Sequence, residues 1–149
     1  MRAPLIALLL STAPVAAVAC PDWEAQPYDG DVSLKAGFAP DPHRVELLAG
    51  GANELGDCGF EAAGFVGTPP DFDLYWSGKS SRLRIGVISD ADTVLLVNGP
   101  DGSWYYSDED EGHNPIVVLN NPEEGLYDIW VGSYNANAYS DAVLLITER

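Results

Sequence analysis

The chain has 149 residues, with 23 acidic against seven basic side chains and a formal net charge of −16. So large an acidic excess excludes nucleic-acid binding through phosphate neutralisation, which needs Lys and Arg, and it disfavours docking on anionic membrane surfaces. The length fits a single domain.

The first 19 residues have the pattern of a cleaved signal peptide. Arg2 supplies a positive charge, residues 5–10 form an apolar core, and Ala17-Val18-Ala19 is a small-residue cleavage site. This apolar run is too short to span a bilayer, which takes about 20 residues. We therefore expect a periplasmic or secreted protein without a membrane span, with one domain over residues 20–149.

Cys20 and Cys58 are the two cysteines of the chain. Two cysteines in an exported protein usually form a disulfide, because the compartment is oxidising. Such a bond would tie the N-terminus of the mature chain to its body. The alternative is lipidation of Cys20, which directly follows the cleavage site, although Ala17 stands where a lipoprotein favours Leu.

Hydrophobic alternation predicts short strands after a weakly patterned stretch at residues 20–42. Residues 72–76 and 83–87 place an apolar side chain at every second position. Further strands are expected at residues 45–49, 92–97, 104–107, 115–120, 126–132 and 142–147. Residues 98–102 (NGPDG) form a hairpin turn. About seven or eight strands at this spacing, without a helical period, predict an all-β, jelly-roll-like antiparallel β-sandwich.

Acidic residues gather on the turns between these strands, and no Lys or Arg occurs from Ile85 to Glu148. Calcium takes six to eight oxygen ligands, and loop carboxylates often supply them. We therefore consider Ca²⁺ as a cofactor. Its candidate ligands are Asp90, Asp92, Asp101, Asp108 and Asp110. The alternative is a solvated acidic surface, since the segment after Asp108 lacks the bidentate Glu of an EF-hand loop.

Trp104 and Trp130 are candidates for stacking against a ligand, with packing in the core as the alternative. Catalytic signatures are missing, because the chain has neither a Gly-x-Ser-x-Gly elbow nor a Ser-x-x-Lys motif. We expect no enzymatic activity. The alternative function is hydrolysis of cell-envelope or extracellular polymers, for which His113 in a pocket beside Ser or a carboxylate would be the diagnostic feature.

Four segments together resemble the bacterial pre-peptidase C-terminal domain. They are residues 92–97 (DTVLLV), 99–104 (GPDGSW), 107–110 (SDED) and 121–132 (NPEEGLYDIWVG), and the resemblance spans about residues 71–148. Residues 20–23 (CPDW) and 49–51 (AGG) are similar to small stand-alone exported alphaproteobacterial proteins of this type, which are often labelled peptidases.

This resemblance implies a jelly-roll sandwich that acts as a non-catalytic module beside exported enzymes. Some members bind calcium or extracellular polymers. The resemblance therefore favours an accessory or binding protein whose partner is an extracellular or periplasmic protein or polymer.

Overall fold

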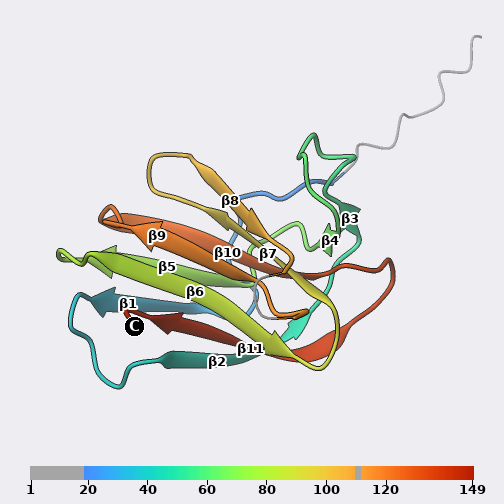
Figure 1. The fold of residues 1–149 in the computed structure, drawn as a ribbon. Helices are drawn as coiled ribbons and strands as arrows, with labels where there is room; N and C mark the ends of the chain where they lie inside the picture. Colours follow the sequence, from blue (N-terminus) through green and yellow to red (C-terminus); the bar gives the residue numbers. More distant parts are fainter. Residues whose placement is uncertain (1–18, 110–111) are drawn as a thin grey trace, which may run out of the picture.

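The computed structural model describes residues 19–109 and 112–149, and it consists of strands and connecting loops (Figure 1). The expected signal peptide and Asp110 lie outside the described residues, apart from Ala19. The eleven strands are β1 Asp31–Lys35, β2 His43–Ala49, β3 Asn53–Glu54, β4 Phe65–Val66, β5 Phe72–Ser77, β6 Arg82–Ser89, β7 Thr93–Asn98, β8 Trp104–Ser107, β9 Ile116–Asn120, β10 Gly125–Ser133 and β11 Ser140–Thr147. No helix in this part of the chain is long and apolar enough to cross a membrane.

The strands form two sheets packed face to face. The four-stranded sheet has the order β2-β11-β6-β9. The seven-stranded sheet is built around β10, which pairs with β5 and then β1 on one edge, and with β7 and then β8 on the other. Beyond β5, the end of β10 pairs with β4, and β4 pairs with β3. The predicted β-sandwich is therefore confirmed.

The main core lies between the two sheets. Along β5 the side chains of Phe72, Leu74 and Trp76 all point into it, because successive side chains of a strand alternate between its faces. Leu144 and Ile146 on β11 contribute from the opposite sheet and are fully buried. The period-2 pattern in the sequence therefore marks the inward face correctly.

The structure also differs from the expectation in two details. It has eleven strands rather than seven or eight, because β1, β3 and β4 add to the larger sheet. In addition, β1 pairs with β5 in parallel, whereas all other pairs are antiparallel. β1 falls in the stretch that the sequence left without a clear pattern, and its half-buried position at a sheet edge explains its weak apolar signal.

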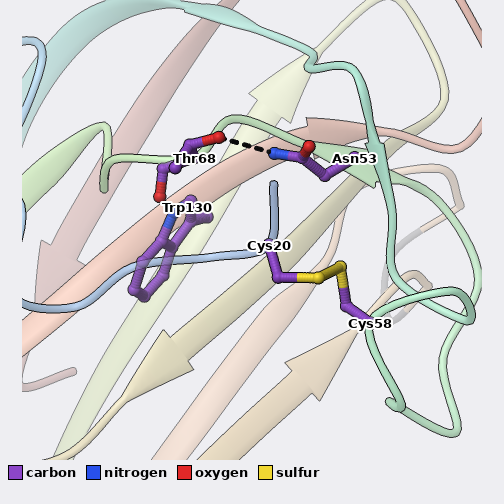
Figure 2. Close-up of a disulfide and its surroundings, with 5 residues drawn as sticks. All are labelled: Cys20, Asn53, Cys58, Thr68 and Trp130. Atoms are coloured by element: carbon purple, nitrogen blue, oxygen red, sulfur yellow. Dashed lines mark hydrogen bonds between the residues drawn. A yellow bond between two sulfur atoms is a disulfide. The ribbon is translucent and has the colours of Figure 1, made fainter. Parts of the chain in front are cut away.

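A second, smaller core lies on the outer face of the seven-stranded sheet. It contains Leu55, Val66, Leu96 and Trp130, all fully buried. The predicted disulfide is present beside it and joins Cys20 to Cys58, as Figure 2 shows. A disulfide-bonded Cys20 has no thiol left for lipidation, so the bond favours the first of the two alternatives for this residue.

The residue Thr68 organises the backbone around this small core (Figure 2). Its carbonyl oxygen accepts a hydrogen bond from the Trp130 indole at 3.4 Å, and its hydroxyl oxygen accepts one from the Asn53 amide at 3.1 Å. The same carbonyl accepts a bond from the backbone N–H of Asp22 at 2.8 Å. Thr68 therefore fixes the start of the N-terminal segment against the outer face of the sheet.

Candidate binding groove

A row of polar side chains crosses the outer face of the seven-stranded sheet. Strand register places Asp31 of β1 beside Asp73 of β5, and Asp73 beside Asp128 of β10. The row continues to Asn98 of β7 and ends at Trp104 of β8. The immediate neighbours of these residues along β5, β7 and β10 point into the main core, so the row itself projects from the opposite face.

The N-terminal segment forms one wall of a groove over this row. Backbone hydrogen bonds hold the two ends of this segment. The N–H of Asp22 donates to Thr68, and the N–H of Tyr28 donates to Pro70. Figure 1 shows this segment, in blue, passing the β7–β8 hairpin before it enters β1. The resulting cavity has a volume of about 500 Å³. Its lining residues are Trp23, Asn98, Gly99, Pro100, Asp101, Gly102, Trp104, Leu126 and Asp128.

Two indole rings border the groove and remain accessible. Trp23 is 53% exposed and Trp104 is 37% exposed. The ring of Trp104 is held in place, because it packs at 5.4 Å on Trp130 and at 5.1 Å, edge to face, on Phe60. Trp104 can therefore offer a fixed aromatic surface to a ligand.

Trp130 cannot stack on a ligand, contrary to its selection from the sequence, because it is fully buried in the small core. Its position follows from β10, which is central in its sheet and covered by the segment around Cys58 on the outer side. Trp130 instead packs against the ring of Trp104 and helps to hold it in place. Trp76, on the inner face, is buried in the main core.

Asp73 and its groove-lining neighbour Asp128 are the most unusual carboxyl groups on this face of the sheet. They are only 5% and 4% exposed, and Asp128 lies on the groove floor. The Oδ1 atom of each has no hydrogen-bond donor among the described residues. Burial raises the pKa of Asp73 to about 7, with further contributions from the neighbouring Asp128 and Asp31. Burial also raises the pKa of Asp128.

Strand register places Asp73 and Asp128 directly opposite each other, so that the two carboxyl groups are neighbours on the outer face of the sheet. Two buried like charges cannot both ionise cheaply. Ionisation of the second carboxyl group is therefore disfavoured, and a bound cation would relieve the repulsion between the two.

Asp71 is a third buried carboxylate, but its role is structural. Its Oδ2 accepts a 2.6 Å hydrogen bond from the backbone N–H of Val131. Burial raises the pKa of Asp71 to about 7, while this bond acts in the opposite direction. Asp71 thereby fixes the segment before β5 against β10, and it does not line the groove.

The four candidate calcium ligands within the described residues do not come together at one place. Asp90 and Asp92 precede β7 and Asp108 follows β8, so these three lie at one end of the β7–β8 pair. Asp101 lies at the hairpin tip, on the order of 20 Å away along the six residues of β7. Among residues 19–109 and 112–149, no group of three or more His, Cys, Asp or Glu side chains could hold a metal ion. Asp110 lies outside the described residues.

The structure gives Asp101 and Asp92 separate local roles. Asp101 accepts hydrogen bonds from the backbone N–H and the hydroxyl of Ser103, at 2.9 and 2.7 Å. These bonds lower the pKa of Asp101 and stabilise the hairpin turn. Asp92 lies 3.8 Å from Nδ1 of His113, and its Oδ1 is buried without a donor among the described residues.

His113, the diagnostic residue for the hydrolase alternative, is 68% exposed at its side chain. Its contact is the Asp92 carboxylate, and no serine hydroxyl is hydrogen-bonded to it in the described part of the chain. His113 therefore has the setting of a surface residue.

Sequence reasoning missed Trp23, Asp73 and Asp128 as site residues. Asp73 and Asp128 alternate with large apolar residues, and this pattern is typical of a solvated outer face. Two features of the sequence nevertheless indicate that these residues could be part of a site. Asp73 and Asp128 each lie inside a strongly apolar strand, and Trp23 follows three residues after Cys20, which anchors its segment.

A comparison with known protein families finds no match, and no curated protein matches the chain. Among solved structures, the chain is similar to the pre-peptidase C-terminal domain of a collagenase from Bacillus anthracis. The TM-score is 0.52 and the identity 12%, over 83% of this chain and 99% of that domain. A periplasmic inhibitor of g-type lysozyme from Aeromonas hydrophila, PliG, aligns with a TM-score of 0.41 and 15% identity, over 80% of this chain and 97% of that one.

The first likeness confirms the sequence-based resemblance at the level of the fold. At 12% identity it extends to the fold alone. A fold of this kind does not by itself determine function, which depends on the groove.

Proposed function

We propose that the chain is an exported, non-catalytic binding module whose ligand occupies the groove between Trp23 and Trp104. The observation that carries this proposal is the buried Asp128 carboxylate on the floor of a cavity whose walls hold two accessible indoles. An apolar surface with a few precisely placed polar groups is the usual composition of a ligand site. Core packing alone would not leave both rings accessible.

The disulfide supports the proposed export, because bonds of this kind persist in oxidising compartments and are rare in the cytosol. It also serves the groove directly. By holding Cys20 against the body, it restricts the segment that carries Trp23. A periplasmic or extracellular site of action is consistent with a partner that is a protein or a polymer of the cell envelope.

A hydrolase is the second candidate, and one observation favours it. Asp73 and Asp128 are neighbouring buried carboxyls, and a pair of neighbouring carboxyls is also the catalytic arrangement of aspartic proteases. That chemistry needs both carboxyls to reach the substrate, whereas only Asp128 of this pair lines the groove. Glycoside hydrolysis likewise needs two carboxyls that flank the scissile bond, and Asp73 does not line the groove. Binding is therefore the better supported function.

Intrinsic fluorescence tests the proposal, because Trp76 and Trp130 are buried and report little on the groove. The protein would be titrated with two probes, an arginine-containing peptide and a neutral chito-oligosaccharide. We expect a saturable change with one of them, weakened in Trp23→Ala and in Trp104→Ala. Trp23 is exposed, so its replacement should leave the fold intact.

No response to either probe, or a response in both variants that is as strong as in the wild type, would contradict the proposed function. Azocasein serves as the control for hydrolysis. Its cleavage by the wild type, lost in Asp128→Asn, would favour the hydrolase instead.

A further inference from the structure

We propose that the groove binds the guanidinium group of an arginine side chain from a basic polypeptide, and that this cation neutralises the buried carboxylate of Asp128, the neighbour of Asp73. The inference rests on the proposed function, since it names the ligand class of the same groove. It assigns a role to a carboxyl pair that the packing of the sandwich does not require.

The pair lacks a positive partner within the protein. The two ion pairs among the described residues join His113 to Asp92 and Arg149 to Asp41, so neither involves the groove. Asp73 and Asp128 each have a buried Oδ1 without a donor. Asp128 lines the groove, so a cationic donor from a ligand can offset the charge of its carboxylate.

The groups that face the pair are acidic or neutral on every side. Asp31 of β1 lies beside Asp73, and Asn98 of β7 lies beside Asp128. The hairpin contributes Asp101, whose pKa is lowered, so it stays ionised. The groove therefore has a negative potential that only a cation can neutralise.

The indole walls favour arginine over lysine. A guanidinium is planar, stacks on aromatic faces and donates in a fork that matches a carboxylate. Trp104 is fixed by Trp130 and Phe60 and can offer its face, while Asp128 lies on the floor of the same cavity. An ammonium group would pair with Asp128 without the stacking contribution.

The distribution of charge favours a basic polypeptide as the carrier of this arginine. The net charge is −16, and residues 85–148 hold no Lys or Arg. The negative charge of the protein speeds its association with basic partners and favours them over other partners. Both effects are stronger at low salt. The same surface repels nucleic acid and other polyanions.

Calorimetry with a defined pair of probes tests the inference. The first is a blocked nine-residue peptide of alternating Arg and Gly, and its matched control carries neutral citrulline in place of Arg. Titration at pH 7 in two buffers of different ionisation heat measures the protons released. We expect binding of the Arg peptide alone, with release of a fraction of a proton, because burial raises the pKa of Asp73 to about 7.

Variants distinguish binding in the groove from attraction to the overall negative charge of the protein. We expect Asp128→Asn to weaken binding about tenfold or more, as for a lost charge-assisted contact. Asp141→Asn makes the same charge change on the exposed face of the other sheet and should have little effect. Trp23→Ala provides a second groove variant whose folding is not at risk, because the ring is exposed.

Equal binding of the citrulline peptide, or equal weakening by Asp128→Asn and Asp141→Asn, would overturn the inference. Binding of the chito-oligosaccharide without the Arg peptide would overturn it too, while leaving the proposed function standing. If neither probe binds, the proposed function falls with it.

Discussion

Asp73 and Asp128 lie directly opposite each other on β5 and β10, and both carboxyl groups are buried on the outer face of the sheet. The pair is costly when both groups are ionised, and no basic side chain of the described structure offsets this cost. Its effect on stability should be visible as a dependence on pH.

We predict that the protein becomes less stable as the pH rises from 5 to 8. The folded-state pKa of Asp73 is about 7, above its ordinary value of 3.8. The folded state therefore binds more protons between these values. The stabilising contribution is fully present below about pH 4 and is lost as the pH rises through about 7. Asp71, whose pKa is also raised to about 7, acts in the same direction.

Thermal melts of the wild type and of Asp73→Asn measure this effect. The Asn amide is neutral at every pH, as the protonated carboxyl is. We expect a higher midpoint than the wild type at pH 8 and a flatter pH profile, with about 3–5 °C for each kcal/mol in a domain of this size. Asp141→Asn is the control for net charge. If the melting midpoint of Asp73→Asn depended on pH as strongly as that of the wild type, the prediction would be contradicted.

The sequence was sufficient to predict the sandwich, because inward side chains alternate regularly along β5, β6 and β10. It was also sufficient to pair Cys20 with Cys58. The groove could not be predicted in this way. Asp73 and Asp128 are far apart in sequence and meet only through strand register, and register is a property of the assembled sheet.

The acidic residues of the loops show the opposite case, in which residues close in sequence lie far apart in space. Asp92 and Asp101 are close in sequence and share the turns of one hairpin region, which favoured a common site. The chain between them is extended, however, and a strand of six residues separates its ends by about 20 Å. Clustering in sequence therefore did not translate into clustering in space.

We expect that Gly132 cannot be replaced by a larger residue without disturbing the packing of the strands around it. A Cβ atom there would collide with the backbone oxygen of Phe65 and would lie 2.8 Å from Cγ2 of Val94. Because backbone cannot move aside cheaply, we expect Gly132→Ala to destabilise the fold by about 3 kcal/mol. Denaturant unfolding followed by circular dichroism measures this loss.

Gly86→Ala is the matched control, since Gly86 is also a strand glycine. A Cβ atom there would meet Cγ1 of Ile116 at 3.4 Å, an ordinary contact. Replacing a strand glycine by Ala without a clash should be neutral or stabilising by about 0.5–1 kcal/mol. Equal effects of the two substitutions would show that β4 does not pack on β10 as described.

The calcium hypothesis remains a prediction. No three acidic side chains of the described residues are arranged to hold a metal ion, so a site at the end of the hairpin with Asp90, Asp92 and Asp108 would need backbone carbonyls or water as further ligands. Asp92 has a buried oxygen without a donor among the described residues. If calcium binds the folded state there, millimolar calcium raises the melting midpoint and EDTA lowers it. We expect Asp92→Asn to abolish this rise and Asp101→Asn to retain it. A midpoint that calcium leaves unchanged would end the hypothesis.

The disulfide should contribute to stability and to ligand binding by separate routes. Cys20 and Cys58 are 38 residues apart, and closing a loop of that length stabilises a fold by about 3–4 kcal/mol through chain entropy. The double variant Cys20→Ser, Cys58→Ser should therefore melt at a clearly lower temperature. It should also bind the Arg peptide more weakly, because Trp23 is then held only by the backbone bonds around it. Trp23→Ala with the disulfide intact isolates the second route, since it should weaken binding at an unchanged midpoint. Wild-type binding in the double variant would mean that the N-terminal segment stays in place without the bond.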